Sequence, residues 1–494
     1  MLKTEREFGL FDAIMMGLSG AIGFEIFVLL DYAYFQLTGP TIVSALLLGG
    51  LINMLIMLSY CELGAAMPKI GGEYTYIKTA YKGFTAFISG CFRWLASIFG
   101  AALAAISFTR QLAYFSLILS PAVQNSILAQ TPLIAVIAVM ILAALEIKGA
   151  KKIGAIVVIA FIAIFTIFIS SGILRRLPPV EIFPKTLEGL PGAFAATVYM
   201  FPMFFGMRSL IAAAARIKNP GKNVPKGILL SALLIIPLYV ALAYVAVGVV
   251  PLGNYNEPFL NLAAENVIPE VGGALFAVAG MAASLSALGT SLAVQSSIIR
   301  GMSRDGYLPK TLLSIHRRFG TPYVATISGS LFIMILSAIG TIEFLGYAAS
   351  FGSILVFALV NLSLLKLRKD KPYMERPFKT PLYPFTPIAG VIMSMALLVF
   401  PIFIDVNAAS ALVSGIGLTA VVLATYYIRM MGRYRLQIAL GGASLGTGIS
   451  LLVLMGLAEI GFISPMFPYI PSYVMLVVSA ISIIAGILNV TTRG

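Results

Sequence analysis

The sequence predicts an all-α protein that crosses a membrane many times, and three observations lead to this fold class. First, 60% of the 494 residues are hydrophobic and only 11% are charged, whereas soluble globular chains carry roughly 25% charged residues. Second, apolar runs of about 20 residues, each long enough to span a bilayer as a helix, recur from end to end. Third, basic residues gather in alternate connections between these runs, as the positive-inside rule requires. Nothing alternates with the period of a β-barrel, so helices are the structure that satisfies the backbone in lipid.

The apolar runs give the positions of the expected helices in chain order. We expect about 14 helices, near residues 10–36, 41–66, 84–118, 130–147, 153–173, 192–215, 227–250, 271–300, 323–341, 343–365, 385–404, 408–429, 437–460 and 472–490. The polar connections between them are short, and the longest lie near residues 174–191 and 366–384. No separate soluble domain is therefore expected.

The basic residues predict the orientation of these helices. The alternate connections contain Lys3, Arg6, Lys69, Lys78, Lys82, Lys148, Lys151, Lys152, Arg216, Lys218, Lys222, Lys226, Arg304, Lys310, Arg317, Arg318, Lys366, Arg368, Lys369, Lys371, Arg376, Lys379, Arg429, Arg433 and Arg435. The intervening connections carry few basic residues, and the connection at 251–270 carries only acids. We therefore expect a multi-pass protein of the plasma membrane with both termini in the cytoplasm. The same asymmetry accounts for the net charge of +14 without a nucleic-acid partner.

The scarcity of catalytic and metal-binding side chains excludes several functions. The two cysteines, Cys61 and Cys91, and the one histidine, His316, provide neither a disulfide framework nor a zinc site. We identify only Glu25 as an acid at mid-span, so a paired-carboxylate enzyme is not expected. A channel would need a ring of polar pore-lining residues, and none is visible. We expect no enzyme, no metal and no cofactor apart from a coupling ion.

A cluster of glycines interrupts the first expected helix. Gly17, Gly20 and Gly23 lie within seven residues, and each weakens a helix by about 1 kcal/mol relative to alanine. A helix broken in mid-membrane exposes backbone groups that a substrate or an ion can satisfy. Close helix packing through small residues is the alternative reading of the same glycines.

The sixth expected helix has a matching irregularity. Pro202 precedes Phe204, Phe205 and Gly206, and a charged residue, Arg208, follows while the segment is still apolar. Interrupted helices at corresponding places in two halves of a chain are the best sequence indicator of a transporter site. The pattern therefore favours a broken sixth helix beside a broken first helix.

Four motifs resemble those of the amino acid–polyamine–organocation permeases. They are Ile-Gly-Phe-Glu-Ile-Phe at 22–27, Glu-Leu at 62–63 leading to Pro-Lys-Ile-Gly-Gly-Glu-Tyr-Thr-Tyr at 68–76, Lys-Asn-Pro-Gly-Lys-Asn-Val-Pro at 218–225, and Ser-Arg-Asp-Gly-Tyr-Leu-Pro at 303–309. Together they keep the order and spacing of that family across about 300 residues. The other helices match the family only in number and length, and the last two go beyond its commoner pattern of about 12 spans.

The resemblance implies a leucine-transporter-type fold and a transport function. The core would cover residues 1–384, with two inverted five-helix repeats near 10–173 and 192–365 and discontinuous first and sixth helices. Residues 385–494 would add about four accessory helices. The chain would be a secondary transporter, by symport or antiport, of amino acids or related organic cations through alternating access. The alternatives are a membrane sensor or non-transporting relative, and a transporter of polyamines or other organic solutes.

The resemblance also nominates a substrate site between the two broken helices. In relatives, backbone N–H groups of the first helix hold the substrate carboxylate, and carbonyls and aromatic residues of the sixth helix receive the rest of the molecule. The positions that correspond here are Ile22, Gly23, Phe24, Glu25, Ile26, Phe201, Phe204, Phe205, Gly206 and Arg208.

Two of these positions depart from the family pattern because they are charged. Glu25 replaces the second glycine of the first motif, and Arg208 lies just after the glycine of the sixth helix. A charge inside a membrane is costly and by default marks function, and we hypothesise that the two side chains pair. Glu25 could receive a substrate ammonium while Arg208 takes a carboxylate, or it could carry a proton. The third reading is a structural ion pair that closes a polar hole.

The coupling ion stays open between H⁺, carried by Glu25, and Na⁺. The hydroxyls of Ser286, Thr290 and Ser291, with the carbonyls of Ser19 and Ile22, are a candidate oxygen cage for Na⁺. Such hydroxyls more often bond to their own backbone. The fifth helix lacks the lysine that fills the cation position in some relatives.

Two further arginines lie in the third expected helix, Arg93 and Arg110. We expect both to lie near the ends of a long, tilted helix and to extend toward the interface. The oligomeric state and the identity of the substrate stay open.

Overall fold

The computed structural model describes residues 6–69, 71–81, 83–117, 120–148, 154–175, 177–178, 180–184, 189–253, 257–339, 341–431, 436–460 and 472–491. The regular structure of these residues is helical, and their one β-bridge joins Phe8 to Ile217. The expected all-α fold class is therefore confirmed. Several of the basic residues used for orientation, such as Lys3, Lys151 and Arg433, lie outside the described residues.

Each expected span coincides with a helix or with a broken helix. The helices are α1 (Leu10–Ala21), α2 (Glu25–Tyr32), α3 (Ile42–Ala66), α4 (Gly72–Ala80), α5 (Phe84–Ser116), α6 (Pro121–Ala129), α7 (Thr131–Ile147), α8 (Gly154–Leu174), α9 (Leu190–Met200), α10 (Arg208–Ala213), α11 (Pro220–Val249), α12 (Phe259–Val267), α13 (Gly272–Arg304), α14 (Tyr323–Ile339), α15 (Ile342–Asp370), α16 (Phe385–Val399), α17 (Val406–Met431), α18 (Leu436–Glu459) and α19 (Ser472–Thr491). The short helices α4, α6 and α12 lie in connections and were not expected. α11 begins seven residues earlier than expected because Pro220, which needs no hydrogen-bond acceptor, starts it.

The helices are long and apolar enough for a multi-pass membrane protein. By length and composition, seven helical stretches of the described residues can cross a membrane, and the first of them, Leu10–Ala66, contains two of the expected spans. An eighth stretch combines α6 and α7, which meet at a bend of 72°. Shorter apolar helices occupy the positions of α8, α14, α16 and α19.

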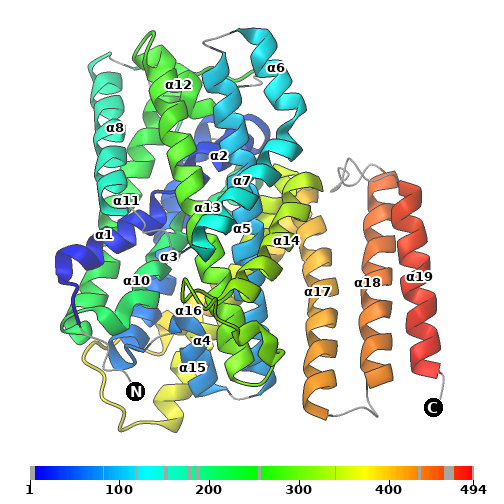
Figure 1. Ribbon diagram of the computed structural model, residues 1–494. Helices are drawn as coiled ribbons and strands as arrows, with labels where there is room; N and C mark the ends of the chain where they lie inside the picture. Colours follow the sequence, from blue (N-terminus) through cyan, green and yellow to red (C-terminus); the bar gives the residue numbers. More distant parts are fainter. Residues whose placement is uncertain are drawn as a thin grey trace.

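The bundle has two chemically different ends. α4 and α10 lie toward one end, and α6 and α12 lie at the other (Figure 1). We call the first the basic end, because arginines and lysines at the ends of α15 and α4 pair there with acids at the ends of α3 and α13. The second is called the opposite end.

The packing order brings the two interrupted helices into contact and places the last helices at one side. α1 packs on α11 and on the 3₁₀ segment that follows α9, and α5 packs on α13 and α15. α17 packs on α15, α18 on α17, and α19 on α18, which gives a row of three helices at one side of the molecule (Figure 1). The inverted relation of the two repeats, and the division at residue 384, stay predictions.

Candidate functional site

The first broken helix contains a three-residue interruption. α1 ends at Ala21, α2 begins at Glu25, and the backbone of Ile22 leaves the helical region (φ −74°, ψ 84°). One carbonyl group that the break frees, that of Ala21, accepts hydrogen bonds from the Gly23 N–H (2.8 Å) and from the Tyr239 hydroxyl (2.5 Å). The expected break is present, and the protein itself satisfies this carbonyl group.

The second broken helix changes its winding instead of opening. α9 ends at Met200, a 3₁₀ segment (η4) covers Phe201–Met207, and α10 begins at Arg208. Pro202 is the second residue of the segment and has no N–H group to donate to the preceding turn. Hydrogen bonds of a 3₁₀ helix have poorer geometry than those of an α-helix. The sixth span is therefore interrupted where the proline and glycine predicted.

The two interruptions touch at a pair of glycines. A Cβ atom at Gly206 would collide with the backbone of Gly20 and Ala21, and a Cβ atom at Gly20 would collide with the carbonyl group of Gly206. Only glycine fits at these two positions. Both readings of the glycine cluster thus hold, because Gly23 lies in the break while Gly20 provides close packing.

Glu25 turns its carboxyl group back over the interruption. It is the first residue of α2, where free backbone N–H groups and the helix dipole favour an anion. A Cβ atom added at Gly23 would meet the Oε2 atom of Glu25, so the carboxyl group lies directly against the break. That oxygen is buried and has no hydrogen-bond partner among the described residues. A buried polar atom without a partner is costly and is available to a ligand.

Arg208 is buried beside the second interruption, with 7% of its surface exposed. Its Nε atom donates to the carbonyl group of Phe205 (3.2 Å), and its Nη2 atom donates to the hydroxyl of Ser353 on α15 (3.2 Å). The guanidinium lies over the rings of Phe205 and Phe357, 4.5 and 5.0 Å from their centroids. Its Nη1 atom lies 3.8 Å from a carboxylate oxygen of Glu73 and makes no hydrogen bond to a described residue.

The hypothesis that Glu25 pairs with Arg208 is wrong for this structure. The two charges are close enough to interact electrostatically, but the guanidinium of Arg208 is turned toward Glu73 instead. The reading of Glu25 and Arg208 as one closed structural ion pair therefore does not hold. Each of the two groups keeps one buried nitrogen or oxygen atom without a hydrogen bond to the part of the chain that the structure describes.

Glu73 is the partner that the sequence did not reveal. It lies on α4, is 6% exposed, and accepts a hydrogen bond from the Tyr60 hydroxyl (2.8 Å). Its other carboxylate oxygen lies 3.2 Å from the Nε atom of Arg93. The expectation that Arg93 extends to the interface is wrong, because its side chain pairs with Glu73 and donates to the Ser97 hydroxyl (2.9 Å). Glu73 stood inside a recognised motif, but nothing in the motif indicated burial.

The large apolar residues named from the family differ in their access to the site. Phe24, Ile26, Phe201 and Phe204 are almost fully buried, whereas Phe205 is half-buried. The rings of Phe201 and Phe205 meet edge to face at 5.7 Å. Phe205 is therefore the aromatic residue best placed to meet a substrate, and the substrate-contact role of all five residues stays a prediction.

The candidate Na⁺ cage is not closed in this structure. Ser19, Ser286 and Thr290 are exposed, and Ser291 is half-buried. The Thr290 hydroxyl donates to the carbonyl group of Ser286 one turn earlier (2.9 Å), which is the ordinary behaviour of a hydroxyl in a membrane helix. The described residues also contain no group of His, Cys, Asp and Glu side chains that could hold a metal ion.

The first expected span contains a second acid, Asp31, which lies toward the opposite end. Asp31 lies on α2 and accepts the backbone N–H of Phe259 on α12 (2.8 Å), and the Arg110 guanidinium is 3.8 Å away. Arg110 is partly exposed, at 42% of its side chain. An acid inside an apolar run was the signal that could have identified Asp31.

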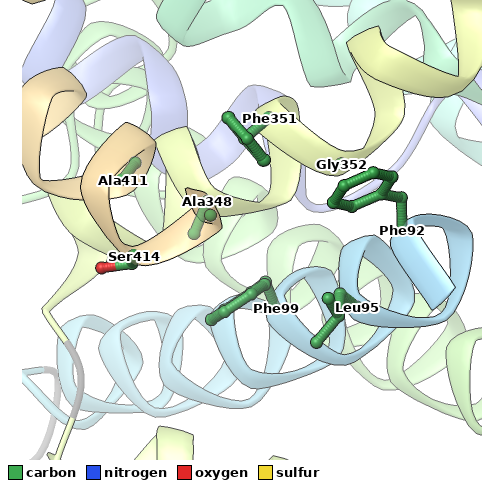
Figure 2. Close-up of a pocket in the computed structure, with 9 residues that line it drawn as sticks. Phe92, Leu95, Phe99, Ala348, Phe351, Gly352, Ala411 and Ser414 are labelled. Atoms are coloured by element: carbon green, nitrogen blue, oxygen red, sulfur yellow. The ribbon is translucent and has the colours of Figure 1, made fainter. Parts of the chain in front are cut away.

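A small hollow lies between α5, α15 and α17. Figure 2 shows its lining, in which Phe92, Leu95 and Phe99 on α5 face Phe351 on α15. Its lining is apolar apart from Ser414, and none of the residues nominated for substrate binding contributes to it. It is therefore a separate feature from the candidate site.

Comparison with known proteins gives a consistent family likeness over most of the chain. Residues 8–425 match the amino acid permease family. The chain is 28% identical over 421 residues to the branched-chain amino acid permease BcaP of Bacillus subtilis (strain 168), which covers 80% of this chain and 88% of the relative. It is 24% identical over 401 residues to the methylthioribose transporter of the same organism, covering 78% and 87%. The vacuolar cationic amino acid transporter 2 of Arabidopsis thaliana is 25% identical over 388 residues, covering 73% of this chain and 59% of the relative.

Proposed function

This chain belongs to the amino acid permease family, and from that premise we propose that it transports amino acids of zero net charge, held between Glu25 and Arg208. Membership of the family makes the chain a secondary transporter of amino acids or related organic solutes and not an enzyme. In the proposed site the carboxyl group of Glu25 receives the substrate ammonium. The guanidinium of Arg208 receives the substrate carboxylate.

The observation that carries this proposal is a pair of complementary unsatisfied atoms. Oε2 of Glu25 and Nη1 of Arg208 are both buried and without hydrogen bonds to described residues. An unsatisfied buried group costs about 1–3 kcal/mol, and more when it is charged. An amino acid has an ammonium donor and a carboxylate acceptor on one carbon atom, so it could satisfy both atoms at once. The roles are reversed relative to the family, whose first-helix N–H groups hold the carboxylate.

The buried charges around the site support a substrate without net charge. Glu25 and Arg208 carry opposite charges, and Glu73 and Arg93 form a second opposite pair. The four side chains sum to zero when all are ionised. A zwitterion leaves this sum unchanged, whereas a cationic amino acid would add one uncompensated charge in a region of low dielectric.

The surroundings of Arg208 support an apolar substrate side chain. The rings of Phe205 and Phe357 flank the guanidinium, and Phe205 is the half-buried aromatic residue of the set. Apolar and aromatic linings with a few placed polar groups are typical of small-molecule sites. A relative that carries the name of a branched-chain amino acid permease agrees with this choice.

The membrane orientation and the coupling ion are part of the same proposal. The concentration of Lys and Arg at the basic end supports a cytoplasmic position for that end in the plasma membrane, with both termini on that side. Glu25 acts here as the ionised partner of the substrate ammonium, so it does not carry the coupling ion in this proposal. We favour H⁺ over Na⁺ as the coupling ion, since Ser286 and Thr290 of the candidate cage are exposed and Ser291 is half-buried.

Uptake into proteoliposomes tests the proposal. We expect saturable uptake of neutral apolar amino acids, driven by an inward H⁺ gradient, and weak uptake of lysine and polyamines. Glu25→Gln and Arg208→Gln should each raise the KM by about 10- to 100-fold, since a hydrogen bond to a charged group is worth about 1.5–3 kcal/mol. Arg216→Gln, which removes an exposed arginine paired with Glu7, serves as the matched control.

Three results would contradict the proposal. Preferred uptake of lysine or a polyamine would overturn the charge argument. Unchanged uptake by both site variants would place the substrate elsewhere. Thermal stabilisation by an amino acid without any uptake would indicate a sensor or a non-transporting relative.

A further inference from the structure

Asp405 is a buried carboxylic acid that the transport site does not use. It lies immediately before α17, outside the two expected repeats, and is 5% exposed. No lysine or arginine of the described chain lies within ion-pair distance of it, so its hydrogen-bond donors are hydroxyl and amide groups. A buried acid without a cation in a membrane protein requires an explanation.

Only one oxygen atom of Asp405 has an ordinary structural role. Oδ1 accepts the backbone N–H of Asn407 (2.9 Å) and lies 3.3 Å from the Asn407 side-chain amide. This is the bond of an N-cap residue to the second residue of its helix, a position where aspartate is preferred. Capping therefore accounts for Oδ1 and leaves Oδ2 unexplained.

The second oxygen atom joins two helices of the transport core. Oδ2 accepts the hydroxyl of Tyr347 on α15 (2.7 Å) and the hydroxyl of Tyr32 at the end of α2 (3.2 Å). The ring of Tyr199 on α9 lies between them, 5.0 Å from each of the two tyrosine rings. Tyr347 and Tyr199 are almost fully buried. One carboxylate oxygen thus joins α2, the second half of the first interrupted helix, to α15, and the Tyr199 ring of α9 packs between the two tyrosines.

The helices that Asp405 joins are the two that flank the candidate site. α2 begins with Glu25 and ends with Tyr32, two turns away. α15 carries Tyr347 and, less than two turns further, the Ser353 hydroxyl that contacts Arg208. Any movement that opens a path from the opposite end between α2 and α15 must pull at least one tyrosine hydroxyl away from Oδ2.

We propose that Asp405 is a positioning residue of the transport cycle, which closes the site toward the opposite end by tying the end of α2 to α15 through Tyr32 and Tyr347. The closure is reversible, because each tyrosine bond is a single hydrogen bond that water can replace when the helices separate. In this way an accessory helix outside the repeats controls access from one side. The proposal does not depend on which substrate the site binds.

The test separates the capping role from the bridging role. In Asp405→Ser the serine hydroxyl keeps the cap of α17 but cannot reach the tyrosines, whereas Asp405→Ala removes both. Tyr347→Phe and Tyr32→Phe each remove one hydroxyl and keep the ring. These variants are compared in the full chain, reconstituted in liposomes.

The reporter is a cysteine introduced as Ser350→Cys. Ser350 lies between Tyr347 and Ser353 on α15, about one turn from each, and is buried. The natural cysteines, Cys61 and Cys91, are both buried, so labelling of the protein without the reporter gives the background. A membrane-impermeant maleimide is applied separately to each face of the membrane, in the absence of substrate.

When the maleimide is applied at the opposite end, we expect Asp405→Ser and Asp405→Ala to increase the labelling rate of the reporter cysteine by the same factor, about threefold or more. The two tyrosine variants should give smaller increases. The rate from the basic end should not rise. If Asp405→Ser labels like the parent while Asp405→Ala labels faster, only the cap matters and the proposal is overturned. If neither aspartate variant folds, unchanged labelling of Tyr347→Phe would overturn it as well. Because no substrate is present, failure of this test is distinct from failure of the proposed function.

Discussion

The two ends of the molecule hold their acids in different ways. At the basic end Glu62 is fully buried and receives the guanidinium groups of Arg368 and Arg376. At the opposite end Asp405 is almost as buried, yet its donors are tyrosine hydroxyls and amide groups. A buried carboxylate is thus paired with cations at the basic end, whereas at the opposite end it accepts hydrogen bonds from neutral donors.

This difference follows from the charge asymmetry of the sequence and has a mechanical consequence. Arginine and lysine gather at the basic end, so the acids there find cations, as Asp305 finds Lys78 (2.5 Å). The opposite end has few cations: the partly exposed Arg110 lies 3.8 Å from Asp31, whereas Glu265 receives the hydroxyl of Tyr114 (2.5 Å). Separating a buried ion pair leaves two uncompensated charges, whereas separating a neutral donor from an acid leaves one. The contacts of the opposite end should therefore be easier to break.

The largest effect should come from Glu62→Gln at the basic end. The carboxylate accepts two hydrogen bonds from Arg368, one of them at 2.9 Å, and another from the backbone N–H of Thr380 (2.7 Å). Glutamine leaves the guanidinium groups of Arg368 and Arg376 without an anion. Removal of one partner of a buried pair costs about 3–5 kcal/mol, so we expect a marked fall in the thermal unfolding midpoint, measured in detergent by intrinsic fluorescence.

The control for this variant is Asp370→Asn, which removes the acid of an exposed pair on α15, the helix that carries Arg368. A midpoint for Glu62→Gln as high as that of the control would show that the cations at the basic end are not held by Glu62. The comparison between the two ends would then lose its main support.

The sequence predicted the parts of this architecture that depend on composition and on local chain geometry. The spans were predictable because lipid requires long apolar helices, and the two interruptions were predictable because Gly23 and Pro202 weaken helices in their own neighbourhoods. The partner of Arg208 was not predictable. Glu73 reaches it from α4, after a turn in which Gly71 and Gly72 have positive φ angles of 109° and 49°.

Asp405 illustrates a second limit of prediction from sequence. Its role depends on contacts with Tyr32 and Tyr347, which lie 373 and 58 residues away in the chain. No motif contains it, and no local pattern distinguishes it from an ordinary helix cap. The capping of α17 by Asp405 could in principle be predicted from the sequence. The contacts of Asp405 with the two tyrosines could not, because they depend on how α17 packs on the core.

The second largest effect should come from Glu73→Gln, which changes the charge balance of the site without removing a helix contact. Glutamine can still accept the hydroxyl of Tyr60, but it no longer attracts Arg208 or Arg93. We expect Arg208 to turn toward Glu25 and form the ion pair that is absent from this structure. Because that pair would occupy both groups proposed to bind substrate, the KM for neutral amino acids should rise by about tenfold, or ~1.4 kcal/mol.

Arg93→Gln provides the matched control for Glu73→Gln. In this variant Arg208 is the remaining one of the two arginines beside Glu73. Arg208 should therefore keep its position, and the KM for neutral amino acids should change less than in Glu73→Gln. An equal rise of the KM in both variants would mean that the network acts as a general structural unit and does not position Arg208.

A smaller effect is expected at the opposite end from Tyr114→Phe. This variant removes the hydroxyl that Tyr114 donates to Glu265 and keeps the packed ring. Glu265 is exposed, so water can replace the lost donor, and the loss should be about 1 kcal/mol. A fall in the unfolding midpoint as large as that of Glu62→Gln would contradict the view that acids at this end are held weakly.

The smallest effect should come from Asp370→Asn, which removes the exposed ion pair with Lys366 (2.9 Å) at the basic end. The two residues are one helical turn apart on α15, and water and salt screen their charges. We expect an unfolding midpoint that does not differ measurably from that of the parent, at low and at high ionic strength. A clear loss of stability would mean that charge pairing strengthens the basic end even at its surface. An unchanged midpoint would restrict the difference between the two ends to their buried acids, where the choice between an arginine and a tyrosine decides how easily each end opens.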